Sequence, residues 1–136
     1  MAFVLDASVT CAWFFGDERT PEIAALSERT NTECAYVPSL WLVEVANVLI
    51  QASRRGRLPQ ADVGLALATL QRMNIKPSPH QPDITTVVAL SLKHDLTAYD
   101  ALYLAHAVGL LLPLATLDEP LRQAAAAEGL TVWPLG

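Results

Sequence analysis

Short apolar segments alternate with longer helical segments along this chain, and that alternation limits the folds open to it. Three apolar runs have the length of buried strands: Ala2–Leu5, Ala35–Val37 and Leu114–Thr116. Leu130–Trp133 is expected to close the chain as an edge strand, and Ile75–Lys76 forms a short extension after a helix. Because helical segments separate them, the strands are expected to pair in parallel. We therefore expect an α/β fold with a short parallel sheet, and ligands at the carboxyl ends of its strands.

Capping residues give the expected bounds of the helices. Thr20 caps a helix that has Pro21 at its first position. Ser39 is expected to cap a long helix over Leu40–Arg55, with Gly56 as its stop. Four more helices are predicted, over Gln60–Met73, Pro82–His94, Ala98–Val108 and from Pro120 to Gly129.

Composition narrows the class of protein. The 136 residues suit one domain, 1–136, and 52% hydrophobic against 17% charged residues excludes a disordered chain. No apolar stretch reaches about 20 residues and no secretory signal is visible, so we expect a cytoplasmic protein without a membrane span. Cys11 and Cys34 lack metal or redox spacing and are expected to stay reduced. The net charge of −5 disfavours a broadly basic nucleic-acid binder, unless bound cations invert the field locally.

Two acidic residues lie just after predicted strands. Asp6 comes after Ala2–Leu5, and Asp118 comes shortly after Leu114–Thr116. Each has an ordinary alternative: Asp6 as a turn residue, and Asp118 as the N-cap of the last helix. Parallel strands end at one edge of the sheet, so the two carboxylates are expected to be neighbours.

Two further acids lie in apolar helical segments. Glu44 is the one ionised group within Leu40–Ile50, and we expect that helix to bury nearly all its circumference. A buried carboxylate needs a partner such as a cation. The alternative is that Glu44 lies on a narrow strip of the helix that is exposed to solvent. Asp100 comes three residues after Thr97, a spacing that also fits a capping box at the start of a helix. The helix dipole favours an acid in that first turn.

Four carboxylates in one cleft would repel one another and raise one another's pKa. A hard divalent cation with oxygen ligands removes that repulsion, and magnesium in particular takes carboxylates, waters and substrate phosphate oxygens. The pattern therefore points to metal-assisted hydrolysis of a phosphodiester.

Four segments in order resemble the PIN-domain family, and most of all its VapC-type toxins of bacterial toxin–antitoxin pairs: Val4–Ser8, Pro38–Asn47, Thr97–Tyr103 and Ala115–Asp118. The resemblance implies a three-layer α/β/α fold and an acidic quartet at Asp6, Glu44, Asp100 and Asp118. It implies supporting hydroxyls at Ser8 and Thr116, with Asn47 beside them. It also implies endonucleolytic cleavage of RNA with Mg²⁺ or Mn²⁺.

The resemblance further implies protein partners: a separate antitoxin that covers the cleft, a homodimer, and larger complexes with the antitoxin. On this hypothesis Asp6, Asp100 and Asp118 hold one or two metal ions and Glu44 completes the shell. Either Glu44 or Asp100 orients the attacking water. Four basic residues are candidates for contacts with RNA: Arg54, Arg55, Arg57 and Lys93.

Two other features carry separate hypotheses. The consecutive aromatics Trp13, Phe14 and Phe15 suggest either core or a partly exposed patch for an antitoxin helix. His106 is expected to be a core or boundary histidine rather than a ligand. Two rival functions remain open. One is a non-catalytic interaction module; the other is a phosphatase with an aspartyl nucleophile, a class whose motif has a second Asp at the position of Ser8.

Overall fold

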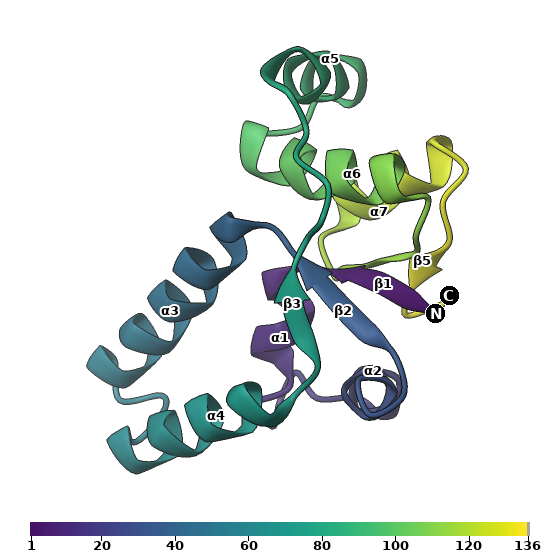
Figure 1. Cartoon of the computed structure of the whole chain (residues 1–136). Coiled ribbons are helices and arrows are strands. Elements are labelled where there is room, and N and C mark those ends of the chain that lie inside the picture. The colour runs from purple at the N-terminus through teal and green to yellow at the C-terminus, as the bar shows by residue number, and fades with distance from the viewer. Residues whose placement is uncertain (136) are drawn as a thin grey trace.

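Five short parallel strands form the middle layer of the computed structural model, which describes residues 1–135 (Figure 1). Their order in the sheet is β3-β2-β1-β4-β5, so the first strand of the chain is the central one. All four pairings are parallel, as the alternating pattern predicts. The strands are β1 Ala2–Leu5, β2 Cys34–Val37, β3 Ile75–Pro77, β4 Leu114–Ala115 and β5 Val132–Trp133.

Helices cover both faces of the sheet, which confirms the predicted three-layer α/β/α architecture. Figure 1 shows α5, α6 and α7 grouped above the strands and α1 to α4 below or beside them. Over residues 1–135 there are seven helices: α1 Ala7–Ala12, α2 Pro21–Arg29, α3 Ser39–Arg54, α4 Gln60–Arg72, α5 Ile84–His94, α6 Ala98–Leu110 and α7 Glu119–Ala127. None of these helices is long and apolar enough to cross a membrane.

The side chains of β1 alternate between the two halves of the core. Phe3 and Leu5 pack with residues of α1 and α2, whereas Val4 packs with residues of α6 and α7. All three are fully buried. A strand that is apolar on both faces therefore needs helices on both faces.

Helix α3 differs from its predicted environment. Its buried residues, Val45, Leu49 and Ala52, pack on α1 and α4, while Leu42 and Val43 are 66% and 61% exposed. The expectation that α3 buries nearly all its circumference is therefore wrong. In Figure 1 the helix extends away from the sheet, so only one flank has protein to pack against.

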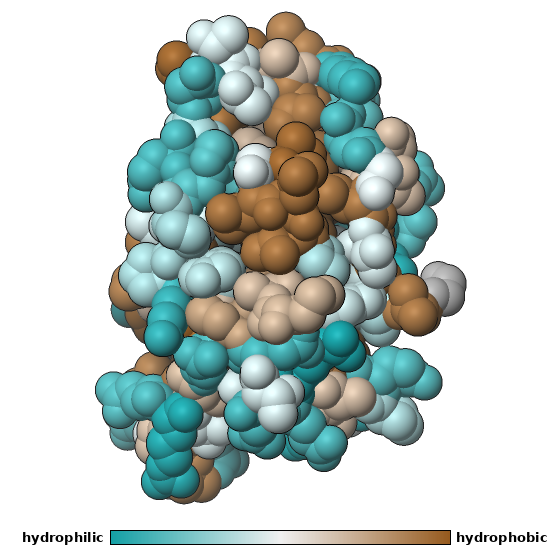
Figure 2. Space-filling model, turned by 45° about the vertical axis from the view of Figure 1, so that its right-hand side comes forward, coloured by the Kyte–Doolittle hydropathy of each residue, from teal (hydrophilic) through white to brown (hydrophobic). Residues whose placement is uncertain are grey.

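Apolar side chains also lie exposed on α5, where Ile84 and Leu92 are about four-fifths accessible at 79% and 80%. Figure 2 shows apolar side chains gathered in the upper half of the molecule, the height at which α5 and α6 lie in Figure 1. An apolar surface of this kind is typical of an interaction site.

Several helix starts differ from the prediction. The sequence pattern did not predict α1, because six residues are too few to display helical periodicity. Helix α5 begins at Ile84 and not at Pro82, because the Asp83 side chain accepts a hydrogen bond from the Thr86 N–H. Pro38 is the N-cap of α3 and Ser39 is its first residue, so Ser39 does not cap it.

The aromatic run after α1 belongs to the core. Trp13 and Phe15 are each only 5% exposed, and the Trp13 indole N–H donates to the Ile23 carbonyl oxygen at 2.8 Å. Phe14 is half-buried and packs against the same core, so the three aromatics form core and not an exposed patch. His106 is buried and hydrogen-bonded to Ser78 Oγ at 2.8 Å, which confirms its interpretation as a core histidine.

Candidate active site

A pocket of about 470 Å³ lies at the carboxyl ends of the central strands, and all four acids identified in the sequence analysis contribute to its lining. Asp6 directly follows β1, and Asp118 is the N-cap of α7, two residues beyond the Thr116 that follows β4. Glu44 comes from the first half of α3 and Asp100 from the first turn of α6. Four separate segments of the chain therefore contribute one carboxylate each.

Two hydroxyl groups hold the Asp6 carboxylate, one from α1 and one from the segment after β4. Its Oδ2 accepts hydrogen bonds from Ser8 Oγ at 2.6 Å and from Thr116 Oγ1 at 2.7 Å. The same two hydroxyls accept the backbone N–H groups of Leu117 and Asp118, at 2.9 and 3.1 Å. This network ties the end of β1 to the loop after β4 and fixes the orientation of the Asp6 carboxylate.

Burial is the main influence on the charge of Asp6. The side chain is 5% exposed, and this burial raises its pKa, with the nearby charge of Asp118 acting in the same direction. The hydrogen bonds from Ser8 and Thr116 oppose the shift without cancelling it. The pocket therefore makes a negative charge at Asp6 costly unless a cation is near.

Glu44 is fixed by a buried tyrosine that sequence reasoning missed. The Tyr103 hydroxyl donates to Glu44 Oε1 at 2.6 Å, and the Tyr103 side chain is fully buried. Burial and the charge of Asp6 raise the pKa of Glu44, although the bond from Tyr103 lowers it. The available signal was the spacing: Tyr103 lies one helical turn after Asp100, on an apolar helix where a phenol needs a polar partner.

Asp118 is the N-cap of α7, Asp100 lies in the first turn of α6 behind the Thr97 cap, and both acids line the pocket. The Asp100 N–H donates to Thr97 Oγ1 at 3.2 Å, and Asp118 Oδ2 accepts the Leu121 N–H at 3.0 Å. Burial, followed by the charges of Asp118, Asp6 and Glu44, raises the pKa of Asp100 to about 6. The ordinary and the functional interpretation of these two residues are therefore compatible.

The donor set fits a hard divalent cation. The pocket offers carboxylate oxygens, and its one thiol, Cys11, has a pKa raised to about 12 by burial and stays protonated. Across residues 1–135 no three acidic, histidine or cysteine side chains already form a ready-made metal site. Magnesium does not require one, because it usually keeps several waters and binds one or two carboxylates.

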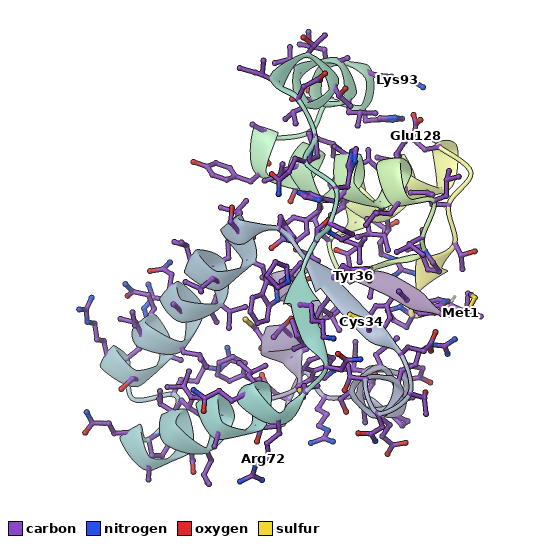
Figure 3. The ribbon with its side chains drawn as sticks, viewed as in Figure 1. Met1, Cys34, Tyr36, Arg72, Lys93 and Glu128 are labelled. Carbon is purple, nitrogen blue, oxygen red and sulfur yellow. The ribbon has the colours of Figure 1, made fainter. Side chains whose placement is uncertain are left out.

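The candidate RNA-binding cations are scattered. Arg57 lines the pocket together with Phe15 and Glu18, and the sequence alone gave it no priority over its neighbours. Lys93 is not part of the pocket lining; it lies on α5, where its Nζ donates to Glu128 Oε2 at 2.8 Å (Figure 3). Arg54 and Arg55 are exposed at the end of α3 and are not part of the pocket lining; nor is Asn47, which is exposed on α3.

A larger cavity of about 640 Å³ contains none of the four acids. It lies between α3, α6 and the segment that joins β3 to α5, and most of its lining side chains are apolar, with Ser78 and His106 among the polar ones. The convergence of carboxylates, and not the size of the cavity, identifies the smaller pocket as the candidate active site.

Comparison with known proteins gives one family and several relatives. A sequence model of the PIN domain matches residues 3–127. Ribonuclease VapC3 of Pyrobaculum aerophilum is 32% identical over 127 residues, which cover 90% of this chain and 94% of the relative.

Solved structures share the fold at lower sequence identity. PAE2754 from Pyrobaculum aerophilum aligns with a TM-score of 0.70 and 22% identity, covering 97% of this chain and 83% of the other. The structure of VapBC2 from Rickettsia felis bound to a promoter DNA fragment aligns with a TM-score of 0.65 and 13% identity, covering 97% of each chain. FitAcB from Neisseria gonorrhoeae aligns with a TM-score of 0.56 and 16% identity, covering 99% of this chain and 100% of the other.

Proposed function

The chain belongs to the PIN-domain family, and from this premise we propose that it is a metal-dependent endoribonuclease, the toxin of a toxin–antitoxin pair. The observation that carries the proposal is the meeting of Asp6, Glu44, Asp100 and Asp118 in one pocket. A relative that covers nearly the whole chain is a ribonuclease, which supports RNA as the substrate.

Asp6, Asp100 and Asp118 would hold Mg²⁺ or Mn²⁺, and Glu44 would complete the set. When bound, such a cation lowers the pKa of the attacking water and offsets charge on the scissile phosphate. Ser8 and Thr116 keep the Asp6 carboxylate oriented toward the pocket by bonding its Oδ2. Tyr103 does the same for Glu44 through Oε1.

Either Asp100 or Glu44 is proposed to orient the attacking water. Burial and the neighbouring charges raise the pKa of Asp100 to about 6 in the metal-free protein, and a cation bound to its carboxylate would lower that pKa again, so the shift favours Asp100 as a metal ligand and not as the proton acceptor. Glu44, whose Oε1 is occupied by the Tyr103 hydroxyl, is better suited to positioning.

The proposed partners are an antitoxin protein and a second copy of this chain. The relatedness to a VapC ribonuclease and the likeness to the VapBC2 and FitAcB structures support an antitoxin. The exposed apolar side chains of α3 and α5 supply surface for protein contacts.

The test is incubation of the purified chain with cellular RNA, with and without Mn²⁺. We expect cleavage with the metal, and at least a roughly 100-fold loss of rate in Asp6→Asn, because one oxygen ligand is replaced by a neutral amide. Asp62→Asn, an exposed acid on α4, is the matched control and should cleave like the wild type. Full activity in Asp6→Asn would refute the assignment, and intact RNA in every reaction would favour a non-catalytic module.

A further inference from the structure

Among residues 1–135, Arg57 is the one basic residue that lines the pocket. The same lining contains five carboxylates, those of Asp6, Glu18, Glu44, Asp100 and Asp118. An RNA phosphate that enters this pocket therefore meets a single fixed positive charge from the protein. Arginine is well suited to that task, because its guanidinium can bind a phosphate through two parallel N–H groups.

The backbone holds Arg57 at this position through the way α3 ends. Gly56 has a φ of +71°, the Gly56 N–H donates to the Ser53 carbonyl at 3.1 Å, and the Arg57 N–H donates to the Ala52 carbonyl at 2.9 Å. These two bonds form a Schellman motif, in which glycine takes the left-handed conformation. The side chain is held as well, with its guanidinium carbon 4.0 Å from the centre of the buried Phe15 ring.

Two acids of the segment after α1 occupy the guanidinium. Arg57 Nη2 donates to both oxygens of Asp17, at 2.9 and 3.1 Å, and to Glu18 Oε2 at 2.7 Å. Both two-pronged edges of a guanidinium, Nη1 with Nη2 and Nε with Nη2, include this nitrogen. The two acids therefore block bidentate binding of a phosphate.

Displacing the two acids requires little free energy. Their side chains are 75% and 41% exposed, and that of Arg57 is 47% exposed. Exposed ion pairs contribute little net stability because water screens them, so a phosphate can compete for the same nitrogen. The Phe15 contact does not involve the acids and keeps the guanidinium at the pocket when they leave.

We propose that Arg57 binds a phosphate of the RNA substrate, and that Asp17 and Glu18 compete with that phosphate for the guanidinium and so weaken RNA binding. This inference rests on the proposed function, because it assumes an RNA substrate at the same pocket. It assigns the substrate contact to one cation of the chain and an inhibitory contact to the segment between α1 and α2.

The test is the anisotropy of a short fluorescein-labelled single-stranded RNA, measured in EDTA so that the RNA stays intact. Arg57→Gln should raise Kd roughly 5- to 10-fold, the range of one charge-assisted phosphate contact. The slope of log K against log salt should become shallower by about 0.7, the value for one phosphate contact on a single strand. Arg57→Lys, which keeps the charge and loses the fork, should fall between Arg57→Gln and the wild type.

Arg72→Gln is the matched control for the loss of one positive charge. Arg72 is exposed near the end of α4 (Figure 3) and outside the pocket, so its loss should change Kd by less than about 2-fold. Thermal melts of each variant check that it folds. Equal effects of Arg57→Gln and Arg72→Gln, or no RNA binding by the wild type, would overturn the role of Arg57.

The competing acids are tested by Asp17→Asn with Glu18→Gln. This double variant should lower Kd about 3- to 5-fold when Arg57 is present, and should lose that gain in the Arg57→Gln background, since the two effects act through one contact. Glu22→Gln with Glu28→Gln, exposed acids on α2, controls for the general change in charge. Equal tightening with and without Arg57 would overturn the competition.

The outcome is independent of the cleavage experiment. Binding in EDTA involves no catalytic metal, whereas the loss of cleavage in Asp6→Asn tests the nuclease assignment alone. A chain that cleaves RNA through Asp6 but binds it equally well without Arg57 would leave the proposed function standing and refute this inference.

Discussion

Burial raises the pKa of three acids of the pocket, Asp6, Glu44 and Asp100, and Asp100 shows this most clearly. Its pKa is raised to about 6, first by burial and then by the charges of Asp118, Asp6 and Glu44. A raised pKa in an acid means that the folded state binds more protons than the unfolded state between about pH 4 and 6. Without metal, the ionised carboxylate therefore destabilises the fold as pH rises through that window.

We predict that Asp100→Asn stabilises the metal-free protein at pH 7.5 and not at pH 4. The group is only partly buried, so we discount the shift for solvent screening to on the order of 1 kcal/mol. That corresponds to a rise in Tm of roughly 3–5 °C. Thermal melts in EDTA at both pH values measure it. A difference in Tm that stays the same at the two pH values would contradict the electrostatic explanation.

The meeting of the four acids in one pocket was predicted from the sequence. The family resemblance also named Ser8 and Thr116, which bond Asp6, but neither Tyr103 nor the partners of Arg57 were predicted. Asp6 and Asp118 stand out because they follow apolar strands, and a parallel sheet brings strand ends together. The Tyr103 hydroxyl on Glu44 and the Arg57 contacts with Asp17 and Glu18 join residues 59, 40 and 39 positions apart. Local spacing contains no information about contacts over such separations. The inference about Glu44 also used a wrong premise, since α3 is not buried all round.

At the scale of elements, prediction succeeded where a segment has its own start and stop signals. Helix α2 begins at Pro21 after the Thr20 cap, and α6 begins at Ala98 after the Thr97 cap, whose hydroxyl bonds the Asp100 N–H. Helix α1 lacks such a signal: its N-cap, Asp6, makes no side-chain cap. Its six residues are held by burial between the sheet and α3, which only the tertiary structure provides.

Packing of α6 against the segment before α5 yields a prediction of its own. A Cβ built on Gly109 would lie 2.3 Å from His80 Nε2, and the His80 ring in turn meets His106 edge-on, with centroids 6.1 Å apart. We predict that Gly109→Ala destabilises the protein by about 1 kcal/mol or more, since the clash outweighs the gain in helix propensity. Urea denaturation measures the change.

The His80→Ala background reverses the expected sign. With the ring removed, Gly109→Ala should stabilise the protein by up to about 1 kcal/mol, because alanine is the better helix former. Destabilisation of equal size in both backgrounds would show that the close approach of His80 is not the reason for glycine at this position.

At the scale of the whole molecule, the proposed metal would join four parts of the chain that are far apart in the sequence. Its ligands come from the end of β1, from α3, from α6 and from the start of α7. A cation that binds only this folded arrangement stabilises all four elements together, and the gain depends on its concentration.

We therefore predict that Mn²⁺ raises the melting temperature of the wild type. At 100 times its Kd the metal should add about 2.7 kcal/mol of stability, or roughly 5–10 °C in Tm. The shift should shrink in Asp118→Asn and persist in Asp62→Asn, whose acid lies outside the pocket. An unchanged melting curve for the wild type at millimolar Mn²⁺ would speak for the non-catalytic module.

The central place of β1 also sets an order of events during synthesis. The first strand pairs on one side with β2, which is translated soon afterwards, but on its other side it waits for β4. The bond between Asp6 and Thr116 spans 110 positions of the chain. A growing polypeptide on the ribosome that stops short of Asp118 thus carries an unfinished sheet and an incomplete set of acids. If the proposed cleavage needs all four acids, a nascent chain acquires it only after Asp118 has been translated and β4 has paired with β1.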